Sequence, residues 1–189
     1  VSTACSGGAL SIAIAGQMVS SSAADLVIAG GCDSLCRLTV DGFGSLFLLD
    51  PDGCRPFDRN RSGINLGEGA GVVVIESRES AEKRGIPILA TLSGWGTSCD
   101  AFHATAPESE GKGAELAMSK ALHLAGLPPS AISHINAHGT ATHDNDLVES
   151  RAIKRLFGEH VPPILSTKGL IGHTLAASGA IDAVISVES

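Results

Sequence analysis

Residues 135–142 read Ile-Asn-Ala-His-Gly-Thr-Ala-Thr, a stretch in which a short apolar run ends in a histidine, a glycine and two threonines. The apolar run begins at residue 132 and is typical of a strand. An amphipathic pattern over residues 147–157 follows and stops at Gly158, which predicts a helix. The stretch therefore predicts a strand, a loop that carries polar side chains, and a helix, in that order.

The same alternation extends through the rest of the chain. Apolar runs predict strands at 25–31, 69–76, 88–94 and 164–166, and helical patterns cover 9–19, 110–125 and 173–187. Residues 32–69 have no regular pattern, and a charged stretch over 78–84 ends at a Gly-Ile-Pro boundary. Alternating strands and helices predict an α/β protein whose strands are largely parallel and buried.

Two further phrases place reactive side chains before helices. Cys5 lies in Val-Ser-Thr-Ala-Cys-Ser-Gly-Gly, directly ahead of an apolar helix pattern. Free N–H groups at a helix start favour a thiolate and could hold a thioester oxyanion, so Cys5 is a candidate nucleophile; the alternative is an inert buried thiol. Lys168 and His173 share Ser-Thr-Lys-Gly-Leu-Ile-Gly-His. The strand ends of an open α/β sheet meet at one edge, so the side chains of these motifs could lie in one pocket.

The two histidines and the lysine have different expected roles. His173 is predicted to start a helix, where the helix dipole disfavours imidazolium, and a neutral imidazole can donate to a developing oxyanion. His138 precedes a glycine and two threonine hydroxyls, which suit the close approach of a ligand. The alternative is that His138 only caps the following turn. The alternative for Lys168 is an ordinary solvated ammonium. The five other histidines are interpreted as surface or structural residues, with His143 the least certain because it adjoins the His138 loop.

Composition limits the other functions. The chain has 189 residues, 43% of them hydrophobic, which suffices for a sizeable core, and its net charge of −7 argues against nucleic acid or an anionic membrane as partner. No apolar stretch reaches transmembrane length. Five irregularly spaced cysteines do not form a disulfide framework, which favours a reducing cytoplasm. Cys32 and Cys36 lack the further ligands of a zinc site, so no metal is expected.

The sequence motifs around Cys5, His138, Lys168 and His173 resemble those of the β-ketoacyl-acyl carrier protein synthases, the elongating condensing enzymes of the thiolase superfamily. The resemblance also includes Pro-Phe-Asp-Arg-Asn-Arg-Ser-Gly at 56–63 and Gly-Glu-Gly-Ala-Gly at 67–71. It implies a five-layer αβαβα thiolase-like fold that is incomplete here, truncated at both ends. Residues 1–84 would be the late part of the N-terminal half, and residues 85–189 the early part of the C-terminal half.

The resemblance implies a role for each matching residue. Cys5 would accept the acyl group, and His138 and His173 would hydrogen-bond the thioester carbonyl of the malonyl substrate as it becomes an enolate. Thr140 and Thr142 match positions that bind the phosphopantetheine arm, and Phe43 is a candidate wall of the acyl pocket. Lys168 would complete the catalytic set with Cys5 and the two histidines, and it would also belong, with Asp146, Asp182 and Glu68, to the polar network that supports them. His143-Asp144-Asn145 replaces the more usual Pro-Leu-Gly before Asp146.

The implied activity is the decarboxylative condensation of an acyl thioester with malonyl-acyl carrier protein in fatty acid elongation. The expected partners are acyl carrier protein and a second subunit of a homodimer or heterodimer, with no metal and no cofactor beyond the phosphopantetheine of the carrier. Three alternatives stay open. They are a ketosynthase of an aryl-polyene or polyketide pathway, a non-catalytic partner that binds carrier protein, and a thiol hydrolase that uses Cys5 and one histidine.

Overall fold

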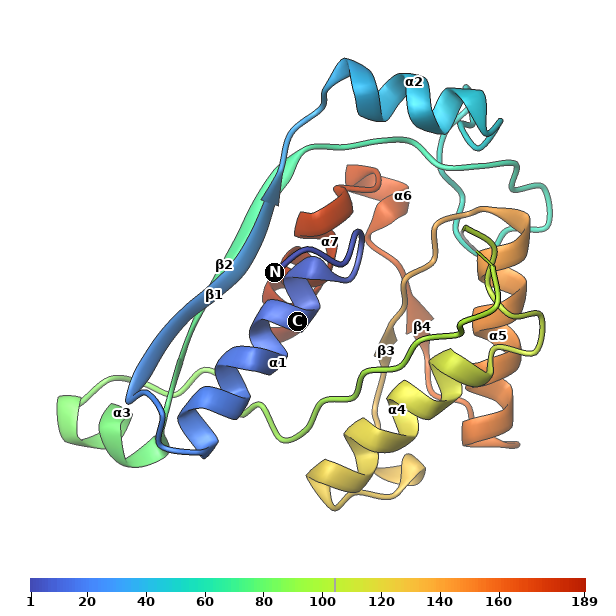
Figure 1. The fold of residues 1–189 in the computed structure, drawn as a ribbon. Helices are drawn as coiled ribbons and strands as arrows, with labels where there is room; N and C mark the ends of the chain where they lie inside the picture. Colours follow the sequence, from blue (N-terminus) through green and yellow to red (C-terminus); the bar gives the residue numbers. More distant parts are fainter. Residues whose placement is uncertain (104) are drawn as a thin grey trace. The chain divides into compact units, whose positions relative to one another are not determined.

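The computed structural model describes residues 1–103 and 105–189, and Figure 1 shows their helices and strands. The chain forms two compact units, each assembled from separate segments. Unit 1 contains residues 1–34, 67–92 and 174–189, and unit 2 contains residues 35–66 and 93–173. The predicted division between residues 84 and 85 stays a prediction.

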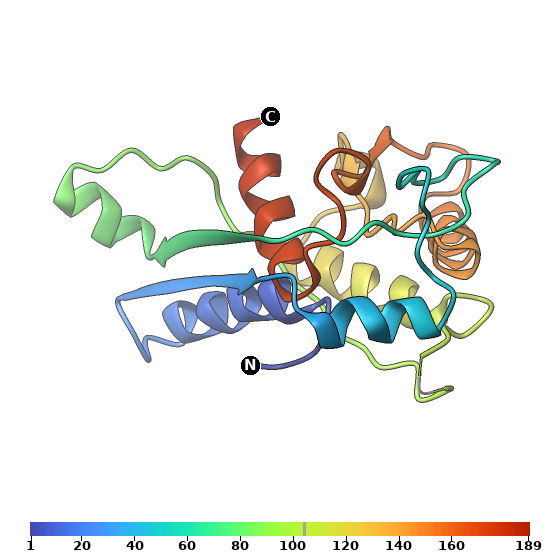
Figure 2. The ribbon, with the colours of Figure 1, turned by 90° about the horizontal axis from the view of Figure 1, so that it is seen from above.

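Unit 1 is a two-stranded ribbon with helices packed on it. Its elements are α1 (Gly7–Ser20), β1 (Leu26–Asp33), β2 (Gly69–Glu76), α3 (Arg78–Arg84), the 3-10 turn η2 (Leu175–Ala177) and α7 (Ser178–Glu188). Helix α1 packs on β1, and α7 packs on β2 and on α1, as Figures 1 and 2 show. The buried core is small and aliphatic, formed by Ile12, Ala15, Ala29 and Ala180.

Close backbone approach explains the glycines of this unit. A Cβ built on Gly8 would lie 2.8 Å from a backbone carbonyl oxygen of η2 and from a backbone nitrogen of α7. A Cβ on Gly71 would lie 2.6 Å from another backbone nitrogen of α7. Small residues therefore let α1, β2 and α7 come together in a core that has few large side chains.

The ribbon differs from the predicted parallel, buried strands. Strands β1 and β2 are antiparallel, in register from Leu26 opposite Glu76 to Asp33 opposite Gly69. The chain leaves β1 at Asp33 and returns to the same end at Gly69, so the second strand must run in the opposite direction. Only one face is covered within the unit. On the other face Ile28 is 70% exposed, and Val72 and Val74 are similarly open.

Unit 2 contains the predicted strand-loop-helix stretch. Its elements are α2 (Arg37–Ser45), α4 (Lys112–Ala125), the 3-10 turn η1 (Pro129–Ala131), β3 (Ile135–Asn136), α5 (His143–Phe157), β4 (Ile164–Leu165) and α6 (Lys168–Ile171). Strands β3 and β4 pair in parallel, as predicted, with Ile135 opposite Ile164. Helix α4 packs against α5, and left-handed Gly126 ends α4.

Three predicted elements are wrong or displaced. The structure assigns no strand to residues 88–94, because no strand of the described chain pairs with them. Helix α2 lies in the stretch that was predicted to be irregular; it is short and buries no residue, and two glycines within its nine residues weaken the helical signal in the sequence. The predicted helix over 173–187 begins only at Ser178, because left-handed Leu175 (φ 49°) interrupts it.

Within the described residues, every helix is too short or too polar to cross a membrane.

Candidate active site

His138 and His173 form an edge-to-face pair of imidazoles in unit 2. Their ring centroids lie 5.1 Å apart and the ring planes are inclined by 82°. His138 follows β3, and His173 follows the short helix α6. The backbone N–H of His173 donates to the carbonyl of Asn65 at 2.7 Å, and the residue is only 2% exposed. Two segments far apart in sequence thus present two imidazoles at one point.

The electrostatic setting keeps His138 neutral. Burial, together with the positive charge of Lys168, lowers the pKa of His138 to about 4. Lys168 is only 1% exposed, so the interpretation of this residue as an ordinary solvated ammonium is wrong. A neutral imidazole at physiological pH can donate its N–H to an oxygen that gains negative charge. The helix-dipole argument for His173 does not hold, since α7 begins five residues after it.

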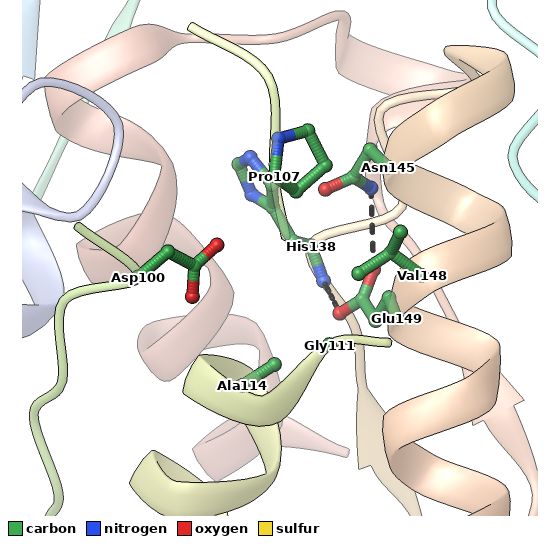
Figure 3. Close-up of a pocket in the computed structure, with 8 residues that line it drawn as sticks. All are labelled: Asp100, Pro107, Gly111, Ala114, His138, Asn145, Val148 and Glu149. Atoms are coloured by element: carbon green, nitrogen blue, oxygen red, sulfur yellow. Dashed lines mark hydrogen bonds between the residues drawn. The ribbon is translucent and has the colours of Figure 1, made fainter. Parts of the chain in front are cut away.

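A glutamate that sequence reasoning missed holds the backbone of His138. Glu149 accepts hydrogen bonds from the N–H groups of His138 (2.7 Å) and Gly139 (2.9 Å), as Figure 3 shows for His138. Burial raises the pKa of Glu149, and the two N–H donors oppose that shift. The only signal in the sequence is its position three residues after Asp146, which places both carboxylates on one face of α5.

Asp146 holds the turn that follows His138. It is 1% exposed and accepts hydrogen bonds from the N–H groups of Phe57 (2.6 Å) and Ala141 (3.1 Å), while the Arg61 guanidinium lies 3.5 Å away. Ala141 has a left-handed φ of 64°, which an alanine adopts only when its surroundings enforce it. Asp146 therefore joins the 55–63 segment to the His138 turn.

The two threonines lie next to each other. The hydroxyls of Thr140 and Thr142 are 2.9 Å apart, and Thr140 is buried. One proton lies in the hydrogen bond between them, and the other remains to be donated to a ligand. Beneath them, the Cys54 thiol contacts the Thr140 carbonyl at 3.6 Å, and burial raises the pKa of that thiol.

The remaining predicted residues lie on other elements. Phe43 is half-buried in α2 of unit 2. Cys5, Glu68 and Asp182 belong to unit 1; Cys5 and Asp182 are half-buried, and Glu68 is exposed. Cys5 lies two residues before α1, directly after Ala4, which has a left-handed φ of 52°. This placement agrees with the predicted position of Cys5 ahead of a helix start.

A pocket of about 210 Å³ opens beside His138 in unit 2 (Figure 3). It is lined by Asp100, Pro107, Gly111, Ala114, His138, Asn145, Val148 and Glu149. The volume is below that of most ligand pockets, so it suits a short group rather than a long acyl chain. Phe43 does not line it, and its predicted role as an acyl-pocket wall stays a prediction.

Comparison with known proteins identifies the family of this chain. The family model of the β-ketoacyl synthase N-terminal domain matches residues 1–81, and that of the C-terminal domain matches residues 89–189. The mitochondrial 3-oxoacyl-[acyl-carrier-protein] synthase of Arabidopsis thaliana is 45% identical over 98% of this chain and 43% of its own length. The 3-oxoacyl-[acyl-carrier-protein] synthase 2 of Staphylococcus aureus is 43% identical over 99% of this chain and 48% of its own.

Solved structures of ketosynthases are also similar to this chain. One is a type II polyketide synthase acyl carrier protein in complex with its ketosynthase bound to the hexaketide (TM-score 0.96, 34% identity, 100% of this chain, 48% of that chain). Another is a ketosynthase in complex with its chain length factor from Xenorhabdus doucetiae (TM-score 0.88, 41% identity, 98% of this chain, 44% of that chain). The predicted thiolase-like α/β class is confirmed, and the chain spans about half the length of its relatives. With two family models matched along its length, this chain belongs to the β-ketoacyl synthase family.

Proposed function

We propose that the protein containing this chain is a β-ketoacyl-acyl carrier protein synthase that elongates acyl chains by decarboxylative condensation. The observation that carries the proposal is the pair of imidazoles at 5.1 Å with a buried lysine beside it, in which His138 is held neutral. Membership of the β-ketoacyl synthase family and the names of the two curated relatives support the same reaction.

The first stage assigns the acyl-accepting thiol to Cys5. Its thiolate attacks the carbonyl carbon of an acyl-carrier thioester, a new S–C bond forms, and the carrier leaves with its phosphopantetheine thiolate. The position of Cys5 before the 14-residue helix α1 supports this assignment, because helix N-termini favour anionic sulfur. Thr140 and Thr142 would orient the phosphopantetheine arm through the hydroxyl proton that their mutual bond leaves available.

The second stage assigns carbanion formation to the imidazole pair. Malonyl-carrier protein loses CO₂, and the bonding electrons move into an enolate whose oxygen accepts hydrogen bonds from His138 and His173. The enolate carbon then attacks the carbonyl of acyl-Cys5, the C–S bond breaks, and the thiolate returns. Removing one donor of this kind typically slows the reaction by about 100- to 1,000-fold.

A second candidate is a ketosynthase of a polyketide or aryl-polyene pathway. The likeness to a ketosynthase that was solved with a polyketide acyl carrier protein favours it. Both candidates share the chemistry above and differ in the acyl chain accepted. On either reading we expect acyl carrier protein as the partner, a homodimer or heterodimer as the complete enzyme, and a cytoplasmic location.

Mass spectrometry of the full-length protein tests the proposal. The protein is incubated with acyl-carrier thioesters of several chain lengths, and its intact mass is compared with that of a Cys5→Ala variant. We expect a gain equal to the acyl group, absent in the variant, and the preferred length separates the two candidates. No gain with any donor would favour a carrier-binding partner without condensing activity.

A further inference from the structure

Asn145 bridges the two carboxylates that hold the His138 turn. Its side-chain nitrogen Nδ2 lies 3.1 Å from Oδ1 of Asp146 and 3.3 Å from Oε2 of Glu149. Figure 3 shows the amide of Asn145 above the Glu149 carboxylate, at the wall of the pocket beside His138. Asn145 comes from the first turn of α5, directly before Asp146, so its short side chain can reach both carboxylates.

The chemistry fixes the orientation of this amide. An ionised carboxylate only accepts hydrogen bonds, so two carboxylate oxygens facing one amide require its NH₂ group rather than its oxygen. The NH₂ group has two protons, one for each carboxylate. Asn145 thereby satisfies Asp146 and Glu149 together, which glycine at this position could not do.

Each carboxylate holds a different part of the turn. Glu149 accepts the N–H groups of His138 and Gly139, and Asp146 accepts that of Ala141. The two anions repel each other, and Asp146 contributes to the raised pKa of Glu149. A proton taken up by Glu149 would weaken its hold on the His138 backbone, because a neutral carboxyl accepts weaker hydrogen bonds.

Other titratable groups lie near this pair of carboxylates. Arg61, from the 55–63 segment, lies 3.5 Å from Asp146. Lys168 and His138 lie on the side of the imidazole pair. Asp100 is exposed at the pocket wall and adds a third negative charge there. Arg61 faces Asp146, whereas the Asn145 amide donates to both Asp146 and Glu149 and brings no charge of its own.

We propose that Asn145 is a positioning residue that couples the Asp146 and Glu149 carboxylates and thereby fixes the His138–Ala141 turn for the condensation. This proposal rests on the proposed function for its kinetic readout but not for its structural one. The isosteric variant Asn145→Asp replaces the bridging donor by a third acceptor. In this variant, acidification protonates one of the three carboxylates, and the resulting O–H group can donate a hydrogen bond to a neighbouring carboxylate.

The test uses the full-length enzyme with Asn145→Asp, Asn145→Gly and a matched control, Gln17→Glu. Gln17 undergoes the same change from amide to carboxylate at an exposed position of α1. We expect kcat of Asn145→Asp to fall roughly tenfold to hundredfold at pH 7.5, the usual effect of losing hydrogen bonds to charged groups. The loss should shrink as the pH falls to 5.5. Asn145→Gly should lose activity without this recovery, and Gln17→Glu should match the wild type.

Hydrogen exchange provides the readout that does not depend on activity. The amides of residues 137–142 should exchange about tenfold faster in Asn145→Asp than in the wild type at pH 7.5, since their acceptors are weakened. Wild-type exchange in this segment together with wild-type kcat in Asn145→Asp would overturn the proposal. A loss of kcat that does not depend on pH in Asn145→Asp would also overturn it. A wild-type enzyme without condensation, but with faster exchange in the variant, would refute only the proposed function.

Discussion

As the pH falls to about 5.5, the imidazole of His138 should stay almost entirely neutral, whereas an ordinary histidine would be largely protonated. With its pKa at about 4, roughly 3% of His138 is imidazolium at pH 5.5, compared with about 90% for a histidine at the reference value of 6.5. The neutral donor thus falls by only a few per cent where an unperturbed one would fall about tenfold. The rate of decarboxylation should therefore show no break near pH 6.5.

The perturbation that tests this reasoning is Lys168→Met. Lys168 is one of the two causes that depress the pKa of His138, so its removal should raise that pKa and move the acidic limb of the activity profile to higher pH. The assay measures CO₂ release from saturating malonyl-carrier protein between pH 4 and 8 at constant ionic strength, so that it reaches the acidic limb set by His138. A wild-type activity that falls through one ionisation near 6.5, or a Lys168→Met profile that coincides with the wild type, would refute the reasoning.

Folding stability must be followed in the same experiment, because the same shift links it to pH. The pKa of His138 is lower in the folded protein than in the unfolded chain, so above pH 6.5 neither state is protonated and nothing is lost. As the pH falls from 6.5 to 4, His138 is protonated in the unfolded chain but stays neutral in the folded protein. The free energy of unfolding then decreases by up to about 3 kcal/mol. Circular dichroism at each pH separates this loss from a loss of chemistry.

Three more predictions concern the packing at Gly8, the hydrogen bonds of Asp146 and the burial of Cys54. Gly8→Ala should lower the free energy of unfolding by about 2 kcal/mol in urea titrations, because its Cβ would overlap backbone atoms of η2 and α7. The control Gly42→Ala, which meets nothing within 4 Å in α2, should be neutral or stabilising; equal effects would contradict the packing argument. Asp146→Asn should cost about 2 kcal/mol and most of kcat, whereas the exposed Asp144→Asn on the same helix should cost little; similar losses in both would count against the Asp146 clamp. Cys54 should resist iodoacetamide at pH 7.5 in peptide mapping while the exposed cysteines react, since burial raises its thiol pKa; alkylation at a comparable rate would be inconsistent with that burial.

Strong local patterns predicted the main elements well. The strand at 69–76 has the predicted bounds, and the helices over 112–125 and 143–157 end at the predicted glycines. These elements carry continuous apolar runs or periodic faces, which a sequence displays directly. The antiparallel pairing of β1 with β2 could not be predicted in this way. It depends on where the chain returns after 35 intervening residues, from Ser34 to Glu68, and no local pattern records that.

The chemistry of the site was only partly visible in the sequence. His138 and His173 were predicted because each lies in a phrase with glycines and hydroxyls, and the structure pairs their rings. The burial of Lys168 and the contacts of Glu149 and Asn145 were not predictable, since they depend on tertiary packing around the His138 turn. A buried ammonium and a solvated one look the same in a sequence.

The central claim is that the two imidazoles of unit 2 serve carbanion formation while the thiol of Cys5 serves acyl transfer. Acyl-loaded full-length enzyme is mixed with malonyl-carrier protein, and intact mass reports both acyl-Cys5 and the β-ketoacyl carrier in the wild type, His138→Ala and His173→Ala. We expect both variants to load Cys5 as the wild type does and to form β-ketoacyl carrier about 100-fold more slowly or worse. Wild-type condensation in both variants, or an acyl group carried by a residue other than Cys5, would contradict the account.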